Sequence, residues 1–155
     1  MKNKYINLYN NFINLTTNKS LYKGLNKQDV FSDRLIFFLI HFAFFFKVFK
    51  NEENSVELQD IYDFVFRQLE LSIREIGYGD QSINKKMKDY LNLFHGLIDK
   101  IHFWDTKEKN EKIEIFDLFL NKAKNNEFLV NYFDKYFENL KNNTLNSYIK
   151  SVGKA

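Results

Sequence analysis

The feature that most constrains the fold is a run of apolar residues at positions 35–46, which His41 alone interrupts. No face of a helix formed here would be polar, so such a helix must be surrounded by other apolar groups. A membrane-spanning helix needs about 20 apolar residues, and this run ends before Lys47. We therefore expect a buried central helix over residues 30–49, with a membrane span as the alternative.

Apolar residues recur at steps of three and four along most of the remaining chain, which is the spacing of one face of an α-helix. The chain has no proline and five glycines, so few positions interrupt a helix. The expected helices cover residues 5–15, 30–49, 54–76, 83–101, 113–124 and 127–140, with a short one near 145–149. The sequence thus predicts an all-α protein, a single compact helical domain over residues 1–155 with about six or seven helices around a buried apolar central helix.

The two longest predicted helices are separated by a turn that contains Gly77 and Gly79. Gly77 suits the left-handed position that ends many helices. We expect Asp80 or Ser82 to cap the next helix, with the carboxylate of Asp80 on the backbone amides that open it. Asn54 and Glu57 have the spacing of a capping box at the start of the preceding one. The expected core stripe of helix 54–76 consists of Leu58, Ile61, Val65, Leu69, Ile73 and Ile76.

The chain lacks cysteine, which excludes disulfides, cysteine-ligated zinc, iron–sulfur clusters and thiol catalysis. The two glycines of the turn follow no predicted strand and precede no phosphate-binding motif, and no serine stands in an evident Ser–His–acid set. The sequence therefore predicts a protein without catalytic residues and without a cofactor. No continuous apolar secretion segment opens the chain, so we expect a cytoplasmic protein that begins almost directly with its domain.

Histidines raise the question of a metal or haem site. His95, Asp99 and His102 stand at positions i, i+4 and i+7, a spacing that can present three metal ligands. No second helix offers an obvious fourth ligand, so we interpret them as a partly exposed polar edge and keep a metal or haem site as the alternative. His41 needs a hydrogen-bond partner if it is buried, and we expect a structural pairing for it.

Positive charge is spread unevenly along the chain. Residues 1–50 carry a net charge of +6 and the remaining residues a net charge of −3. The densest cationic group combines Lys85, Lys86 and Lys88 with Arg74. Such a group can attract a client, the ribosome or anionic lipid, although solvated surface charge is its ordinary interpretation. We expect aromatic residues of the first helix and the last two helices to supply any exposed apolar patch for a partner.

Two segments of the sequence resemble a known family. In the first, Leu21-Tyr22 is followed at the family's intervals by Leu25, Asp29, Arg34 and His41. In the second, residues 73–88 follow an Arg-Glu-hydrophobic-Gly-x-Gly-Asp-x-Ser pattern that leads into a basic helix start, and Phe94-His95-Gly96 comes after it. Together they make residues 5–101 similar to the ubiquinol-cytochrome c chaperone family, while residues 106–155 are loosely similar. The sequence departs from the family pattern at Asn26, Asp33, Ile36 and Leu97.

The resemblance implies a non-enzymatic chaperone that binds newly made cytochrome b and assists assembly of the ubiquinol-cytochrome c reductase complex of the respiratory chain. Further partners that the resemblance admits are a small helper subunit, the ribosome and the membrane surface, but not DNA. It places the protein in the cytoplasm or peripherally at the inner membrane, which for eukaryotic relatives is mitochondrial. The alternatives are a membrane-surface or RNA-binding helical adaptor and, after it, a haem- or metal-handling protein. The candidate partner-binding residues are Arg34, His41, Arg74, Asp80, Lys85 and Lys86.

Overall fold

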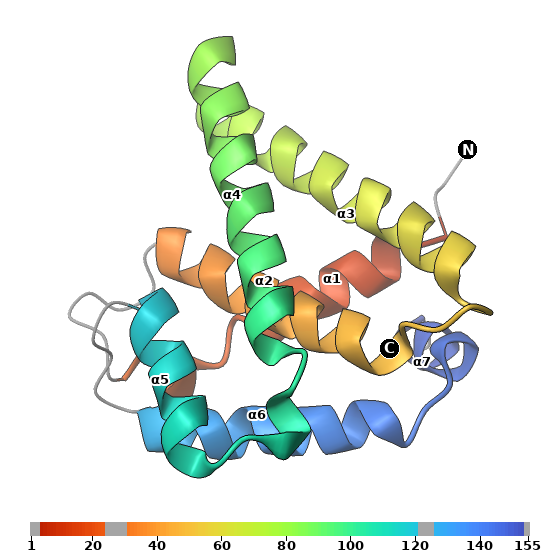
Figure 1. The fold of residues 1–155 in the computed structure, drawn as a ribbon. Helices are drawn as coiled ribbons and strands as arrows, with labels where there is room; N and C mark the ends of the chain where they lie inside the picture. The colour runs from red at the N-terminus through yellow and green to blue at the C-terminus, as the bar shows by residue number, and fades with distance from the viewer. Residues whose placement is uncertain (1–3, 24–30, 121–125, 154–155) are drawn as a thin grey trace.

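The apolar run forms the middle of helix α2 (Phe31–Phe49), around which the other helices are arranged (Figure 1). The computed structural model describes residues 4–23, 31–120 and 126–153, so the expected helix start at residue 30 and the expected helix end at residue 124 lie outside it. The most deeply buried residues of α2 are Phe37, Leu39, Ile40, His41, Phe42, Ala43, Phe44 and Phe45. The prediction of a buried central helix is confirmed, and within the described ranges no helix is long and apolar enough to cross a membrane.

Six further α-helices cover α2. They are α1 (Ile6–Leu15), α3 (Ser55–Ile76), α4 (Asp80–Ile101), α5 (Lys109–Leu120), α6 (Asn126–Lys141) and α7 (Leu145–Val152). Two short 3-10 helices, η1 (Lys19–Tyr22) and η2 (Trp104–Thr106), lie in the connections. The described residues form seven α-helices and no strand, so the prediction of an all-α domain around a buried apolar helix is confirmed.

The helices differ in how much of their length lies against α2. Helices α1, α4 and α6 pack directly on it, α5 packs mainly on α6, and α7 packs on α1. Helices α3 and α4 meet at their connecting turn and diverge toward the body of the protein, so that they form a V whose closed end projects beyond the other helices (Figure 1). We call this closed end, residues 74–88, the hairpin tip.

The core is built mainly from aromatic rings that α2 presents in several directions. The ring of Phe42 lies 5.3 Å from that of Phe12 in α1 and 5.0 Å from that of Phe94 in α4. On another side the ring of Phe44 stacks on Phe133 of α6 at 5.3 Å. Aromatic pairs of this kind each contribute about 0.5–1.5 kcal/mol beyond the area that they bury. They attach α1, α4 and α6 to the same central helix.

This core uses the aromatic residues that we expected to form an exposed apolar patch. The residues of the first helix and the last two helices that are buried instead include Tyr9, Phe12, Phe133, Tyr136 and Phe137. Phe128 is an exception, with 41% of its surface exposed. The expectation of an aromatic docking patch on these helices was therefore wrong, because most of their rings are needed to cover α2.

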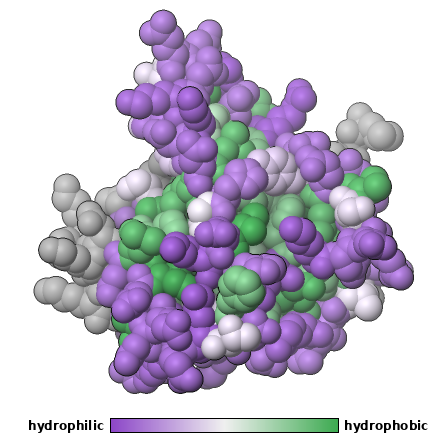
Figure 2. Space-filling model, viewed as in Figure 1, coloured by the Kyte–Doolittle hydropathy of each residue, from purple (hydrophilic) through white to green (hydrophobic). Residues whose placement is uncertain are grey.

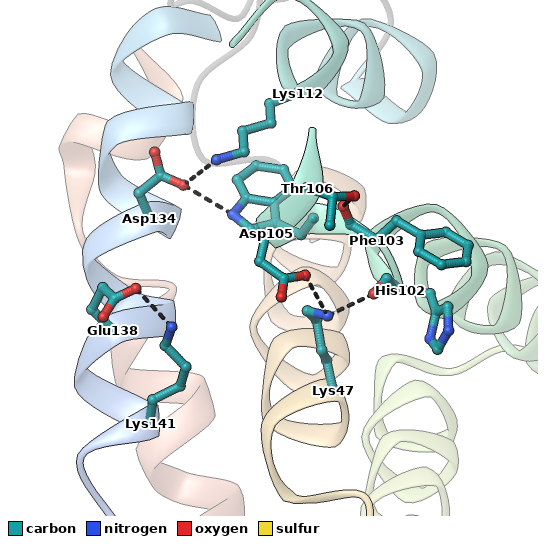
Figure 3. Close-up of polar contacts among 10 residues, drawn as sticks. Lys47, His102, Phe103, Asp105, Thr106, Lys112, Asp134, Glu138 and Lys141 are labelled. Carbon is teal, nitrogen blue, oxygen red and sulfur yellow. Dashed lines mark hydrogen bonds and ion pairs between the residues drawn. The ribbon is translucent and has the colours of Figure 1, made fainter. Parts of the chain in front are cut away.

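The connection between α4 and α5 is fixed to α6 through Trp104 (Figure 3). This side chain is fully buried, and its Nε1 donates a hydrogen bond of 2.9 Å to Oδ1 of Asp134. Lys112 Nζ approaches the same carboxylate oxygen at 2.9 Å and lies 4.8 Å from the centre of the indole ring. One carboxylate thus joins η2, α5 and α6.

Lys47 fixes the same connection to the end of α2 (Figure 3). Its Nζ donates a hydrogen bond of 2.6 Å to the carbonyl oxygen of His102 and lies 3.1 Å from Oδ1 of Asp105. The Lys47 side chain is largely buried and also lies 5.5 Å from the centre of the Phe137 ring. The polar residue that ends the apolar run therefore helps to hold the C-terminal helices in place.

The turn between α3 and α4 agrees with the sequence in one respect and differs in another. Gly77 has a φ of +104°, the left-handed conformation expected of it. Asp80 does not cap α4, because it is the first residue of that helix and its carboxylate accepts a hydrogen bond of 2.8 Å from Nη1 of Arg74. The carboxylate of Asp80 thus binds Arg74 across the turn and not the backbone amides of its own helix.

The capping box expected at the start of α3 was also wrong. The side chain of Asn54 accepts no capping hydrogen bond, and its Nδ2 instead donates to the carbonyl oxygen of Phe49 at 2.8 Å. Glu57 accepts a hydrogen bond of 3.0 Å from the hydroxyl group of Tyr5 and pairs with Lys4 at 3.1 Å. Glu57 therefore links α3 to the start of α1.

The two glycines of the turn make a matched pair of test positions. Replacing Gly77 with alanine should lower the free energy of unfolding by about 1 kcal/mol, because an L side chain disfavours the left-handed conformation. No atom lies within 4 Å of a Cβ added at either glycine, so a steric clash does not complicate the comparison. Gly79→Ala, at φ −73° at the N-cap of α4, requires no left-handed conformation and should lower the free energy of unfolding less than Gly77→Ala. Urea unfolding followed by circular dichroism measures both values, and an equal loss in the two variants would contradict this account.

The shared carboxylate of Asp134 provides a second test. Asp134→Ala leaves the buried indole N–H without an acceptor, which should cost about 1–3 kcal/mol. Asp134→Asn keeps an oxygen that can accept the Trp104 hydrogen bond and loses only the charge pair with Lys112. It should therefore lower the free energy of unfolding less than Asp134→Ala, because ion pairs at partly exposed sites contribute little. Unfolding can be followed by the fluorescence of the single tryptophan. Equal stability of the alanine variant and the unmodified protein would show that the Trp104 hydrogen bond does not stabilise the fold.

Candidate functional site

The hairpin tip brings together four of the six candidate partner-binding residues. All residues from 74 to 82 are exposed, and the outer end of the V is covered mainly by hydrophilic side chains (Figure 2). Arg74 lies in the last turn of α3, Asp80 begins α4, and Lys85 and Lys86 follow within the first two turns of α4. These four residues lie close together because the glycine turn reverses the chain between them.

An ion pair closes the V at this end. Arg74 Nη1 lies 2.8 Å from Oδ1 of Asp80, and its Nε lies 3.6 Å from Oε2 of Glu70 one turn earlier. The hydrogen bond from Arg74 to Asp80 raises the pKa of the guanidinium group. Both side chains of the Arg74–Asp80 pair are exposed, so the pair contributes little to overall stability. The guanidinium group of Arg74 therefore already has a carboxylate partner within the protein.

The three lysines of the hairpin tip differ from Arg74 in the contacts that they make. Lys86 Nζ lies 4.5 Å from the centre of the Tyr78 ring. Lys85 and Lys88 are exposed on α4, and in the described part of the structure none of these three lysines forms an ion pair with a carboxylate. Their charges are therefore available to an anionic partner.

The tip also exposes apolar side chains that the sequence analysis did not identify. Ile76 has 54% of its surface exposed and Tyr78 has 41%. Ile76 was expected to be part of the core stripe of α3, and this was wrong. The earlier residues of the stripe, up to Ile73, are buried, but the hairpin extends beyond the body and Ile76 has no helix to pack against.

The two remaining candidate residues lie away from the tip. Arg34 is an exposed residue in the first turn of α2, beside a small hollow of about 140 Å³ that Leu69 and Ser72 of α3 also line. His41 is fully buried in the middle of α2. Leu25, Asn26 and Asp29, which belong to the first resembling segment, lie outside the described residues.

His41 joins α2 to α6 through two hydrogen bonds. Its Nδ1 lies 2.6 Å from the carbonyl oxygen of Phe37 and its Nε2 lies 2.7 Å from the hydroxyl group of Tyr132. A carbonyl oxygen only accepts, so Nδ1 must carry the proton and Nε2 must accept from the tyrosine. Burial raises the pKa of Tyr132 to about 12, which keeps this hydroxyl group protonated. The expected structural pairing of the buried histidine is present.

Burial also has an electrostatic consequence for His41. It lowers the pKa of the imidazole to about 4, while the hydrogen bond to Phe37 acts in the opposite direction. Aromatic rings of Tyr132, Phe133 and Tyr136 surround the imidazole at centroid distances of 4.9–5.5 Å. A charged imidazole has no carboxylate partner there among the contacts described, so the ring is neutral in the folded protein near pH 7.

A broad open groove of about 1150 Å³ runs along α3. Its apolar lining comes from Phe64, Phe66 and Leu71 of α3 and from Met87 and Leu91 of α4. The charged residues that line it are Lys4, Asp60, Asp63, Arg67 and Glu70. This combination of apolar and charged side chains suits a peptide or helix more than a small polar metabolite.

The alternative metal site is not assembled in the structure. The ring of His95 lies against Tyr62, whose hydroxyl group is 3.1 Å from its Nε2, and His102 follows the end of α4. Within residues 4–23, 31–120 and 126–153, no three histidine or acidic side chains are grouped so as to hold a metal ion. His95, Asp99 and His102 are all exposed, in agreement with the polar edge expected of them.

The described residues form an all-helical domain whose prominent features are a projecting hairpin and a partly apolar groove. A family model described as ubiquinol-cytochrome C chaperone matches residues 23–102, which is more than half of the chain. The chain belongs to this family. A search of curated proteins and a search of solved structures gave no significant match. Family membership indicates a chaperone role in assembly of the ubiquinol-cytochrome c complex, and it indicates a non-enzymatic one.

The buried histidine makes a testable contribution to the pH dependence of stability. The imidazole of His41 has a pKa near 6.5 in the unfolded chain and about 4 in the folded protein. Its contribution to the free energy of unfolding is therefore fully present above pH 6.5 and falls as the pH is lowered. The loss between pH 7 and pH 5 should be about 2 kcal/mol. His41→Gln should be less stable at pH 7 but should lack this part of the pH dependence.

The exposed His102 gives the control, because His102→Gln should keep the full pH dependence of the unmodified protein. Urea unfolding at several pH values, followed by circular dichroism, measures the three slopes. If His41→Gln and the unmodified protein lose the same free energy between pH 7 and pH 5, protonation of His41 is not the cause.

Proposed function

We propose that this protein is a chaperone that binds newly made cytochrome b and assists its assembly into the ubiquinol-cytochrome c reductase complex. The observation that carries the proposal is the family match over residues 23–102. That range contains α2, α3 and α4 and therefore the whole projecting hairpin. The match thus covers the part of the chain that is most exposed to a partner, together with the helix that supports it.

The groove along α3 supports a client with an apolar surface. Newly made cytochrome b offers apolar helices before it is assembled, and such helices can be held in a groove that combines aromatic and aliphatic side chains with charged edges. Phe64 and Phe66 are held in place by the helical body, while Leu71, with 44% of its surface exposed, lies nearer the hairpin tip. We propose that the groove holds an apolar segment of the client.

We further propose that Arg74, Asp80, Lys85 and Lys86 form a partner-binding surface at the hairpin tip. The ion pair of Arg74 with Asp80 fixes the geometry of this end, and the two lysines supply charge for a partner. Arg34 and His41 have other positions in the structure. We propose that His41 has a structural role in connecting α2 to α6, and that Arg34 belongs to the hollow beside α3.

We propose that the C-terminal helices belong to the same functional domain, although the family match ends at residue 102. Helix α6 packs directly on α2, and Tyr132 contacts His41 within the matched region. We therefore propose a single domain over the whole chain, acting in the cytoplasm or peripherally at the inner membrane.

Removing the gene from the host tests the proposal directly. We expect the amount of assembled ubiquinol-cytochrome c reductase to fall, and we expect cytochrome b to co-purify with the tagged protein from a detergent extract. Assembly that is unchanged without the gene would contradict the chaperone role. Absence of cytochrome b from the purified material, with assembly still reduced, would identify a different client.

Two leucine variants test the groove within the same experiment. Leu71→Asp places a charge in the groove at an exposed position, so it should reduce co-purification of cytochrome b severalfold without unfolding the protein. Leu118→Asp is the matched control, because Leu118 is 63% exposed on α5 and does not line the groove. Equal recovery of cytochrome b with both variants would show that the client binds elsewhere.

A further inference from the structure

The apolar side chains at the hairpin tip are exposed in an unusual place. Ile76 continues the core-facing stripe of α3 past the last helix that could cover it, and Tyr78 follows in the turn. Single exposed apolar residues are common on protein surfaces and need no explanation. Here, however, the two residues lie at the turn between α3 and α4, the closed end of the V that projects beyond the other helices (Figure 1), so a flat surface that approaches this end would meet them.

Cations accompany these apolar groups. Lys85, Lys86 and Lys88 lie in the first turns of α4 without a carboxylate partner in the described structure. One nearby carboxylate, Asp80, is already paired with Arg74. The tip therefore combines apolar side chains at its end with unpaired positive charge behind them.

The two other carboxylates of this region do not cancel that charge at the end of the V. Residues 74–88 carry four cations, Arg74, Lys85, Lys86 and Lys88, against two carboxylates, Glu75 and Asp80. Asp89 lies one turn beyond Lys85 and Lys86 on α4, and among the described residues it forms no ion pair with them. The end of the hairpin thus presents a net positive charge.

We propose that the hairpin tip docks on the surface of an anionic lipid bilayer, with Ile76 and Tyr78 in the interfacial layer and Lys85 and Lys86 at the lipid phosphates. Apolar and aromatic side chains favour this interface, and lysines near an anionic surface are attracted to it. The inference rests on the proposed function, because cytochrome b is a membrane protein. It names the bilayer as the partner of the surface at the tip.

The position of the groove agrees with this assignment. Leu71 lines the groove and lies five residues before Ile76 on α3, which is about 7 Å along the helix. Docking by the tip would therefore place one end of the groove next to the bilayer. A client helix could then pass between the groove and the membrane without crossing open solvent.

A nucleic acid is the less suitable partner for the same surface. Proteins that bind single strands combine positive charge with several aromatic faces on which bases stack. Tyr78 is the one aromatic residue among residues 74–82, and Lys86 lies over the face of its ring at 4.5 Å. The tip lacks a second ring for a neighbouring base.

Vesicle sedimentation with the purified full-length protein tests the proposal. The protein should bind vesicles of mixed phosphatidylcholine and phosphatidylglycerol, and binding to phosphatidylcholine alone should be much weaker. Raising the salt concentration should weaken the binding, because exposed charges are screened over about 10 Å at 0.1 M salt. Equal binding to both kinds of vesicle, or to neither, would overturn the proposal, as would binding of a single-stranded RNA probe that displaces the vesicles.

Two double variants separate the charge from the apolar groups. Lys85→Glu with Lys86→Glu should weaken vesicle binding at least tenfold, since each lysine near the surface contributes about fivefold. Ile76→Ser with Tyr78→Ser should also weaken it, with the salt dependence retained. Lys135→Glu with Lys150→Glu is the matched control, because it changes the net charge equally at exposed positions on α6 and α7. Loss of binding in the control equal to the loss in the tip variants would overturn the assignment to the tip.

Co-purification in detergent distinguishes this proposal from the proposed function. The tip variants should lose vesicle binding and still recover cytochrome b from a detergent extract. If they lose cytochrome b in detergent as well, the tip binds the client and the bilayer assignment is wrong. If the unmodified protein binds anionic vesicles but recovers no cytochrome b, docking on the bilayer stands and the proposed client is wrong.

Discussion

The burial of α2 on every side is the constraint on which the rest of the structure depends. Because its run of residues 35–46 has no polar face, other helices must surround it, and α1, α4 and α6 do so with aromatic rings. This explains why most of the large aromatic content is hidden. It also explains why the only polar side chain within the run, His41, is fully satisfied by Phe37 and Tyr132.

The sequence predicted the helices well because their positions follow from local spacing. The left-handed Gly77 was predictable for the same reason. Side-chain partners from distant parts of the chain were not predictable: Glu57 is engaged by Tyr5, 52 residues away, rather than by its own helix start. The exposure of Ile76 was missed because periodicity identifies the face of a helix that is apolar, but not the length over which a neighbour covers it.

The candidate site was predicted in part. The resemblance led to Arg74, Asp80, Lys85 and Lys86, which the turn brings to one end of the hairpin (Figure 1). It also led to His41, whose place in the core follows from the apolar residues around it. No signal in the sequence identified the groove, because its lining combines residues of α3 and α4 with Lys4 and Tyr5, which come together only in the folded protein. The charge pattern indicated a cationic surface, but not that exposed apolar groups stand in front of it.

The hydrogen bond between His41 and Tyr132 joins a residue inside the family-matched range to one outside it. Lys47 does the same through Asp105, and Phe44 through Phe133. The stretch of sequence by which relatives can be recognised is therefore smaller than the stretch that shields α2 from water. Residues 23–102 alone would therefore leave the side of α2 that α6 covers exposed to water.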